Sequence, residues 1–169
     1  GECLPHGSRR RGDKSDDRGH GVTTEAQSME ELIVSAEAQR EIKLKTREEL
    51  NKLTDKIIGI AIEIHRAIGP GFVERIYDQA LRQEFINCKI NSEPQKQIKV
   101  KYKDVELGLQ QIDFLIEGEL ILEIKAVSRI NSAHIAQLIS YLKTIERRVG
   151  LILNFSRDKL EIKRVVNKF

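Results

Sequence analysis

The stretch that decides the fold is QQIDFLIEGELILEIKAV, residues 110–127. On both sides of Gly118 its apolar residues recur at every second position, which is the period of a β-strand. Gly118 itself is a residue that short connections between strands favour. We therefore predict two strands, over 105–116 and 119–127, that form a hairpin with a tight turn.

Three charged residues interrupt the apolar pattern of this hairpin. Side chains of a strand alternate between its two faces. On the first strand this predicts Asp113 on the face opposite to an apolar row, namely Ile112, Phe114 and Ile116. On the second strand the same alternation separates Glu123 and Lys125 from another apolar row, namely Leu120, Leu122, Ile124 and Ala126. Opposed residues of an antiparallel pair share a face, so a three-residue turn over 117–119 sets Asp113 against Glu123. A two-residue turn would set Asp113 against Leu122 instead.

Charges in such an apolar hairpin need a physical reason. Burial of a charged group is costly unless the group is paired or bound to a metal ion. Carboxylate oxygens suit Mg²⁺, or the similar Mn²⁺, so we predict that Asp113 and Glu123 are metal ligands. Lys125 shares the face of Glu123 and could hold a water nucleophile or stabilise charge on a phosphate. The alternative is a cross-strand charge pair on a solvated surface, which is the usual role of Glu-x-Lys on a strand.

Outside the hairpin, periodicity and end signals predict the remaining elements. The first helix has Thr54 as its N-cap and runs to about Ile68, where Gly69-Pro70-Gly71 ends it. The other elements are a helix over 73–85, a strand over 97–103, a helix over 132–147 capped by Asn131 or Ser132, and strands over 149–155 and 159–166. The helix over 73–85 is expected to bury Ile76, Tyr77, Ala80, Leu81 and Phe85. This order predicts the α/β class, with a mixed central sheet flanked by helices.

Composition along the chain predicts its domain organisation. The 169 residues suit one domain and a tail. Residues 1–28 almost lack large apolar side chains, and we predict that they form a disordered tail. Residues 29–50 are charged and permissive for a helix, which predicts a peripheral helical lead-in. The folded domain is then expected over residues 51–169.

Overall composition limits the classes of function. The net charge of +3 permits a nucleic-acid partner without requiring one. Aromatic residues make up only 5%, and Trp is absent, which argues against a stacking platform for single strands. Cys3 and Cys88 lie far apart and match no zinc-binding spacing. No apolar run is long enough for a transmembrane helix, so we expect a cytoplasmic protein without a membrane partner.

Further polar residues are candidates for the same site. Gln137 and Tyr141 lie one helical turn apart on the helix predicted over 132–147. The alternative for them is a polar surface residue and a half-buried tyrosine. Glu74 could add a third acidic group, or it could be an exposed glutamate that the dipole of its helix favours.

A basic run occupies the strand predicted over 97–103. Its residues Lys99, Lys101 and Lys103 make a plausible phosphate-contacting face for nucleic acid. The alternative is a solvated edge strand on which lysines prevent pairing with other chains.

The stretch GFVERIYDQAL, residues 71–81, resembles the signature that names the GxxExxY proteins, read through Gly71, Glu74 and Tyr77. The resemblance covers roughly residues 50–166, and that family is placed in the PD-(D/E)XK nuclease-like superfamily. The resemblance implies metal carboxylates at Asp113 and Glu123, a catalytic lysine at Lys125, a motif near the substrate at Gln137 and Tyr141, and a helical acidic residue at Glu74. The sequence departs from the superfamily pattern where Ile112, and not proline, precedes Asp113.

These observations predict a Mg²⁺- or Mn²⁺-dependent phosphodiesterase that acts on nucleic acid, on DNA in preference to RNA. The alternative is a non-catalytic nucleic-acid-binding or interaction module, because a fold does not by itself imply a function. The small size leaves no separate recognition domain. We therefore expect the chain to act in a homo-oligomer or a larger complex.

Overall fold

The computed structural model describes residues 44–167. The tail predicted over 1–28 and most of the lead-in predicted over 29–50 lie outside the described residues. The elements follow in the order α2 (Arg47–Ile68), α3 (Glu74–Asn87), β1 (Ser92–Tyr102), β2 (Val105–Ile116), β3 (Leu120–Lys125), α4 (Ser132–Thr144), β4 (Val149–Asn154) and β5 (Glu161–Val166). This arrangement confirms the predicted α/β class.

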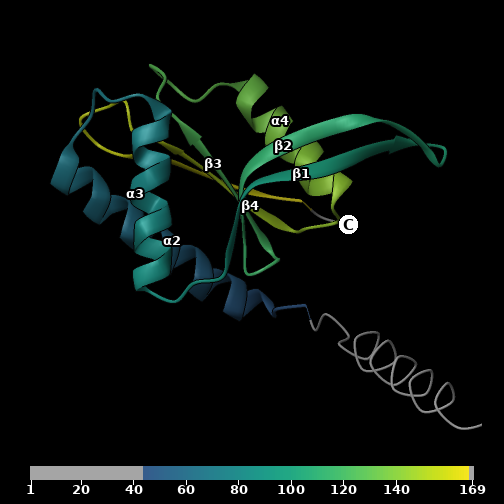
Figure 1. The fold of residues 1–169 in the computed structure, drawn as a ribbon, viewed down its shortest axis with the longest axis horizontal. Helices are drawn as coiled ribbons and strands as arrows, with labels where there is room; N and C mark the ends of the chain where they lie inside the picture. Colours follow the sequence, from purple (N-terminus) through teal and green to yellow (C-terminus); the bar gives the residue numbers. More distant parts are fainter. Residues whose placement is uncertain (1–43, 168–169) are drawn as a thin grey trace, which may run out of the picture. The chain divides into compact units, whose positions relative to one another are not determined.

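The five strands form one mixed sheet in the order β1-β2-β3-β4-β5. Only β3 and β4 run parallel, and α4 makes the crossover between them. Helices α2 and α3 lie on one face of the sheet, and α4 lies on the other (Figure 1). Two apolar clusters therefore fill the domain, one on each face. Because β3 and β4 contribute to both clusters, their side chains are almost all buried, as the apolar runs predict.

The α4 face is held especially close to the sheet at Gly150. A Cβ atom at this position would lie 2.7 Å from the Cδ1 atom of Leu138 on α4. Leu138 is fully buried, so it has little room to move. The absence of a side chain at residue 150 thus lets α4 pack directly against β4.

The start of α2 differs from the prediction. The helix begins at Arg47, and its N-cap is Thr46, which forms a capping box with Glu49. Thr54 was wrongly predicted as the cap. It lies buried within the helix, where its hydroxyl donates to the carbonyl of Leu50 at 2.7 Å. The charged residues before Thr54 continue the helix because the capping box supplies an earlier start signal.

Helix α3 buries a narrower stripe than predicted. Tyr77, Leu81 and Phe85 are fully buried, and Ala80 packs against the same cluster. Ile76 was also expected on the inner face, but 44% of its surface is exposed. It lies one position from Tyr77, which turns it about 100° away from the buried stripe.

The connection between β2 and β3 is the three-residue turn that the alignment of Asp113 with Glu123 requires. Ile116 pairs with Leu120, so the connection has the three residues 117–119. Glu117 and Gly118 adopt φ values of 52° and 68°, which allow the chain to reverse within this short span.

The predicted apolar row of β2 is wrong at one position. Phe114 and Ile116 face α2 and α3, but Ile112 packs into the cluster on the α4 side. The ladder with β1 is interrupted here, between the pairs Lys96–Ile112 and Pro94–Phe114. Gln95, the β1 residue between these two pairs, has a φ of 52°, which departs from the strand conformation. Strict alternation therefore fails next to Asp113.

Candidate functional site

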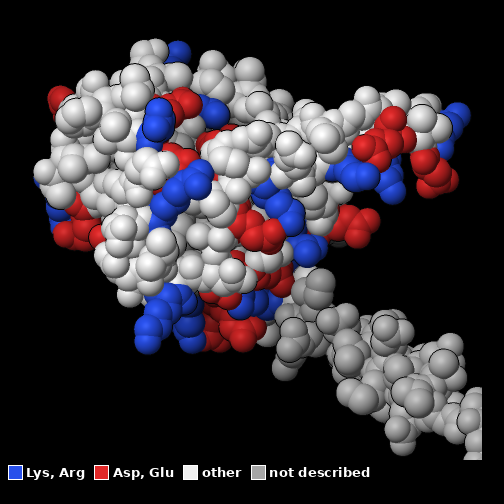
Figure 2. Space-filling view, viewed as in Figure 1, with Lys and Arg blue, Asp and Glu red and all other residues white. Residues whose placement is uncertain are grey.

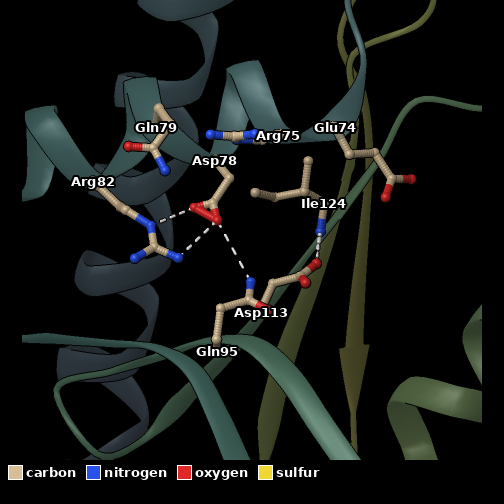
Figure 3. Close-up of a pocket in the computed structure, with 8 residues that line it drawn as sticks. All are labelled: Glu74, Arg75, Asp78, Gln79, Arg82, Gln95, Asp113 and Ile124. Carbon is tan, nitrogen blue, oxygen red and sulfur yellow. Dashed lines mark hydrogen bonds and ion pairs between the residues drawn. The ribbon is translucent and has the colours of Figure 1, made fainter.

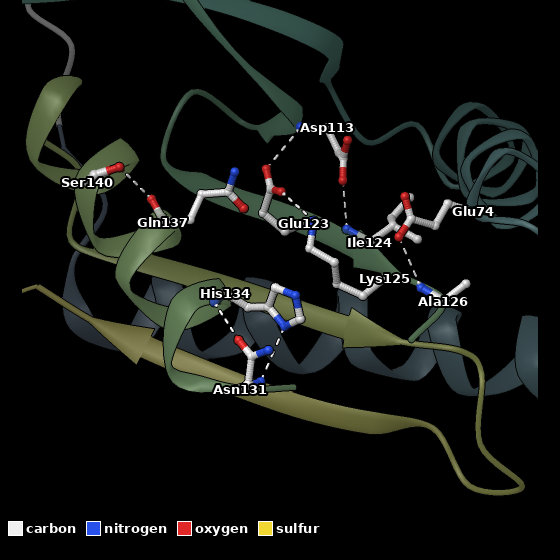
Figure 4. A network of polar contacts seen from close by, with 10 residues as sticks. All are labelled: Glu74, Asp113, Glu123, Ile124, Lys125, Ala126, Asn131, His134, Gln137 and Ser140. Atoms are coloured by element: carbon white, nitrogen blue, oxygen red, sulfur yellow. Dashed lines mark hydrogen bonds and ion pairs between the residues drawn. The ribbon is translucent and has the colours of Figure 1, made fainter. Parts of the chain in front are cut away.

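The candidate site lies where β3 and β4 end. In this parallel pair Lys125 lies opposite Asn154, and both strands finish there. Figure 4 shows Glu123 and Lys125 projecting from the end of β3, with Asp113 beside them from β2. The structure thus brings together the three residues that sequence periodicity singled out.

The carboxylates of Asp113 and Glu123 accept backbone hydrogen bonds where the regular pairing of β2 with β3 stops. The pairing of β2 with β3 reaches only to Phe114–Leu122. Beyond this point the Glu123 carboxylate accepts from the backbone N–H of Asp113 at 3.2 Å. The Asp113 carboxylate in turn accepts from the backbone N–H of Ile124 at 2.8 Å. Both carboxylates are therefore fixed against the end of the hairpin.

Burial makes ionisation of these carboxylates unfavourable. It is the main cause that raises the pKa of Glu123 to about 7, and the neighbouring Asp113 raises this pKa further. Burial also raises the pKa of Asp113, with smaller upward contributions from Glu74 and Asp78. Lys125 opposes both shifts. The site therefore gathers more negative charge than its own residues neutralise.

Lys125 forms an ion pair inside this site. Its Nζ lies 3.3 Å from Oε2 of Glu123, and the two side chains are only 16% and 5% exposed. Because the pair is shielded from water, the ammonium group is held in place and not spread over several rotamers. It can contact a substrate phosphate or a water molecule that enters the site.

Glu74 reaches the site from α3. It is the first residue of this helix, and its Oε1 accepts from the backbone N–H of Ala126 at 3.1 Å. Glu74 and Asp113 also line the same cavity, whose volume is about 390 Å³. Glu74 is exposed in the first turn of α3, as the dipole interpretation expects, and it also lines the cavity beside Asp113, so both interpretations stay open.

The wall of this cavity opposite β3 comes from α3. Asp78 and Arg82 form an ion pair there, with Nε of Arg82 2.5 Å from Oδ2 of Asp78 (Figure 3). Gln95 of β1 donates to Asp78 at 3.5 Å, so the irregular position in β1 also faces the cavity. The cavity is polar and holds both signs of charge.

Gln137 and Tyr141 approach the site from α4. Tyr141 is only 4% exposed and so is more buried than the half-buried alternative implied. Burial, followed by the charges of Glu123 and Asp113, raises the pKa of Tyr141, whereas a hydrogen bond with Gln137 lowers it. The phenol therefore lies within electrostatic reach of both carboxylates.

The structure does not bring the basic run to this site. Lys99, Lys101 and Lys103 are exposed on the β1–β2 hairpin, which extends beyond the part of β2 that pairs with β3. Lys99 forms an ion pair with Glu106 across the hairpin at 3.0 Å. Figure 2 shows acidic and basic side chains interspersed on this arm. A role for these lysines in nucleic-acid binding stays a prediction.

Sequence reasoning missed the residues that hold the loop after Lys125. Asn154 is fully buried, and its side chain exchanges two hydrogen bonds with the backbone of Val127, at 3.1 and 2.8 Å. Its amide also donates to Glu161 at 2.8 Å, and Glu161 accepts from the N–H of Ile130. The only signal in the sequence was a polar residue at the end of an apolar strand.

The acidic pair fits a divalent cation. Its donors are carboxylate oxygens, which Mg²⁺ and Mn²⁺ prefer, and a cation would offset the cost of ionising these two buried carboxyl groups. Among residues 44–167 no group of three or more His, Cys, Asp or Glu side chains could hold a metal ion. A cation bound here would therefore complete its coordination with water or substrate oxygens, as Mg²⁺ usually does.

Comparison with known families agrees with this geometry. A family model described as the PD-(D/E)XK nuclease superfamily matches residues 51–165. The chain belongs to the PD-(D/E)XK nuclease superfamily. Nucleases of this superfamily generally use divalent metal ions. The match does not distinguish the GxxExxY proteins from other members, so that narrower resemblance still rests on Gly71, Glu74 and Tyr77.

Two solved structures match the chain at low sequence identity. The crystal structure of SSO0001 is 16% identical, with a TM-score of 0.46 over 56% of this chain and 50% of that one. The alkaline exonuclease LHK-Exo from Laribacter hongkongensis is 11% identical, with a TM-score of 0.43 over 75% of this chain and 73% of that one. The chain thus spans about half the length of SSO0001. No curated protein matches the chain.

Within residues 44–167, none of the helices combines the length and the apolar character that crossing a bilayer demands.

Proposed function

We propose that this PD-(D/E)XK protein is a metal-dependent phosphodiesterase that cleaves nucleic acid, DNA rather than RNA. One observation carries the proposal: Asp113, Glu123 and Lys125 meet at the end of β3, where burial raises the pKa of both carboxyl groups. Such a cluster costs stability, and proteins retain costly clusters of ionisable groups mainly at functional sites. The same proposal includes a cytoplasmic location and action within a homo-oligomer or larger complex.

Each residue has a role that follows from its position. Asp113 and Glu123 would hold the metal ion, which supplies a water molecule of lowered pKa and neutralises charge on the phosphate. Lys125 donates hydrogen bonds to a phosphate oxygen or orients the attacking water, because its ammonium group is held beside Glu123. Glu74 adds negative charge on the α3 side of the cavity, where it can accept a hydrogen bond from that water.

The residues of α4 would act on the other side of the site. Tyr141 and Gln137 offer a hydroxyl and an amide group that can donate to substrate oxygens. The raised pKa of Tyr141 keeps its hydroxyl protonated at neutral pH, so that it remains a donor. The exposed side chain of Gln137 is the one that an incoming strand meets first.

One observation favours a non-catalytic binding module as the second candidate. Both carboxylates accept backbone N–H groups where the β2–β3 ladder ends, so they also complete the hydrogen bonding of the hairpin. A protein that binds nucleic acid without cleaving it could keep Asp113 and Glu123 for this structural purpose alone.

Cleavage of labelled nucleic acids tests the proposal. Duplex DNA, single-stranded DNA and RNA are each incubated with the full chain in Mg²⁺, in Mn²⁺ and in EDTA. We expect cleavage that requires metal, is faster on DNA than on RNA, and is lost in Lys125→Ala. Failure of the wild-type chain to cleave any substrate with either metal would leave the binding module as the better conclusion.

A further inference from the structure

A pocket with both basic and apolar residues in its lining lies at the other end of the sheet. Its volume is about 540 Å³, and it is lined by Arg47, Leu50, Arg148, Val149, Arg164, Val166 and Asn167. Val149 is the first residue of β4 and pairs with Val166, the last residue of β5. Because β4 runs from this pocket toward the candidate site, its six residues separate the two by about 17 Å at ~3.3 Å per residue.

The three arginines of this pocket come from separate parts of the chain. Arg47 opens α2, Arg148 immediately precedes β4, and Arg164 belongs to β5. Within residues 44–167 none of them forms an ion pair with a carboxylate. The ion pairs of this part of the chain are Lys52–Glu48, Arg66–Glu63, Arg82–Asp78, Lys96–Glu93, Lys99–Glu106 and Lys125–Glu123. The described part of the fold therefore gathers three cations around one cavity without pairing them with carboxylates of its own.

The hydrogen bonds that these arginines do form leave donors available. Arg164 donates to the side-chain oxygen of Asn51 at 2.9 Å, and Arg148 donates to the carbonyl of Lys45. A guanidinium group carries five N–H donors, so each of these two side chains keeps most of its capacity. Neutral acceptors also leave the positive charge uncompensated.

Asn167 provides an independent observation. Its backbone N–H donates to the carbonyl of Arg148 at 2.8 Å, which ties it to the pocket. Its side-chain Nδ2 is buried and has no acceptor among the described residues. A buried donor without an acceptor destabilises the fold, so a ligand that brings acceptor oxygens is favoured here. The side chains of the pocket thus favour an anion.

The rest of the lining is apolar. Leu50 and Val149 are buried, with 2% and 4% of their surfaces exposed, and Val166 is half exposed. A small inorganic anion would use the guanidinium groups and leave this surface unused. A nucleotide uses both parts, because its phosphate oxygens accept from the arginines and its sugar or base covers the apolar side chains.

We propose that this pocket binds the phosphate and the adjoining sugar or base of a nucleotide. The nucleotide is either a unit of a nucleic-acid strand or a free nucleoside diphosphate, which share this chemistry. The pocket is separate from the metal centre and contains none of its residues. The inference therefore does not depend on phosphodiesterase activity.

Binding in EDTA tests the proposal, because metal-dependent cleavage is then excluded. The probes are a fluorescein-labelled 20-bp DNA duplex and, separately, ADP with the full chain. Arg47→Gln is the main variant, because Arg47 forms no ion pair within residues 44–167 and its replacement leaves no buried charge. Arg148→Gln with Arg164→Gln removes the other two cations. The matched control is Arg66→Gln, an exposed arginine at the opposite end of α2.

We expect at least fivefold weaker binding in Arg47→Gln and a larger loss in the double variant, with wild-type binding in Arg66→Gln. For DNA, the logarithm of the association constant decreases linearly with the logarithm of the salt concentration. The magnitude of this slope should be smaller by about 0.9 for each phosphate that the variant no longer neutralises. If the variants lose affinity for the duplex, the pocket binds a nucleotide unit of a nucleic-acid strand. If they lose affinity for ADP alone, the pocket binds a free nucleotide. Wild-type affinity of Arg47→Gln and of the double variant for both probes, with melting midpoints unchanged, would overturn the proposal.

Discussion

The backbone N–H of Asp113 donates to the carboxylate of Glu123 at 3.2 Å, across the end of the β2–β3 hairpin. The Asp113 carboxylate accepts in turn from the residue after Glu123, Ile124, at 2.8 Å. These two bonds hold a pair of acidic groups in a largely buried place, where burial raises the pKa of both and the charge of Asp113 raises that of Glu123 further. The stability and the chemistry of the site both depend on what offsets the unfavourable free energy of ionising these buried carboxyl groups.

Without metal, the stability of the fold should depend on the ionisation of Glu123. Its pKa rises from the ordinary 4.5 to about 7, so the folded state binds the proton more tightly than the unfolded state. The resulting stability is fully present below pH 4.5 and is lost as the pH rises through about 7. The loss is on the order of 3 kcal/mol. Urea unfolding in EDTA at several pH values measures it.

Glu123→Gln removes this titration and keeps an oxygen that can accept from Asp113. The variant should therefore show a smaller decrease in unfolding free energy between pH 4.5 and 7 than the wild-type chain. Glu63→Gln is the control, because Glu63 is exposed and pairs only with Arg66. If the unfolding free energy depends on pH equally in the wild-type chain and in Glu123→Gln, the Glu123 carboxyl group does not cause the pH dependence.

Divalent metal should relieve the same cost. Mg²⁺ or Mn²⁺ at a hundredfold excess over its dissociation constant should stabilise the folded chain by ~2.7 kcal/mol. Asp113→Asn and Glu123→Gln should lose this metal-dependent gain together with cleavage. Lys125→Ala should lose cleavage and keep the gain, because lysine does not ligate the metal.

Thermal melts with and without metal, made on all three variants beside the cleavage assay, separate these roles. Lys143→Ala is a suitable control, because Lys143 is an exposed lysine in the last turn of α4. Normal cleavage by Lys125→Ala would refute the assignment of the site even in an active nuclease.

Glu74 should contribute charge and not only a hydrogen bond. Glu74→Gln retains an oxygen that can accept from Ala126, so the fold should persist while phosphodiesterase activity falls about tenfold or more. Glu84→Gln changes a glutamate on the same helix away from the cavity, and its activity should match that of the wild-type chain. Wild-type turnover in Glu74→Gln would limit Glu74 to a structural role at the start of α3.

Tyr77 should stabilise the turn that precedes α3. The tyrosine is fully buried and stacks on Phe155, and its hydroxyl donates to the carbonyl of Gly69 at 2.9 Å. The hydroxyl also accepts from the N–H of Phe72 at 3.3 Å. Tyr77→Phe leaves both backbone groups without this partner, which should cost about 1–3 kcal/mol of unfolding free energy.

Chemical denaturation of Tyr77→Phe measures this loss. Tyr102→Phe is the matched control, because 62% of Tyr102 is exposed and its change should be within about 0.5 kcal/mol. An unchanged midpoint in Tyr77→Phe would mean that the turn does not depend on the hydroxyl.

Local pattern was enough to place the strands and the central acidic motif, although β1 begins at Ser92, five residues before the predicted strand over 97–103. The period of two marked the hairpin, and counting back from the three-residue turn aligned Asp113 with Glu123, as the Ile116–Leu120 pair confirms. Glu123 and Lys125 fell on one face for the same reason. These features depend on backbone geometry over a few residues, which the sequence displays directly.

Apolar periodicity failed at two positions. Ile112 packs on the α4 face although it shares the period of Phe114 and Ile116, and the regular pairing with β1 is missing between Ile112 and Phe114. The start of α2 depended on the capping box of Thr46 and Glu49, a local signal that apolar periodicity alone does not reveal. Neither effect leaves a mark in the periodicity of the segment that it changes.

The sequence by itself determined the α/β class, the hairpin and its Asp, Glu and Lys, because these follow from side-chain alternation and turn length. Only the tertiary structure decided that Glu74 and Tyr141 reach this hairpin from α3 and α4. It alone gathered Arg47, Arg148 and Arg164 around one pocket. The physical reason is that such contacts join residues far apart along the chain, and packing of helices on both faces of the sheet sets their distances.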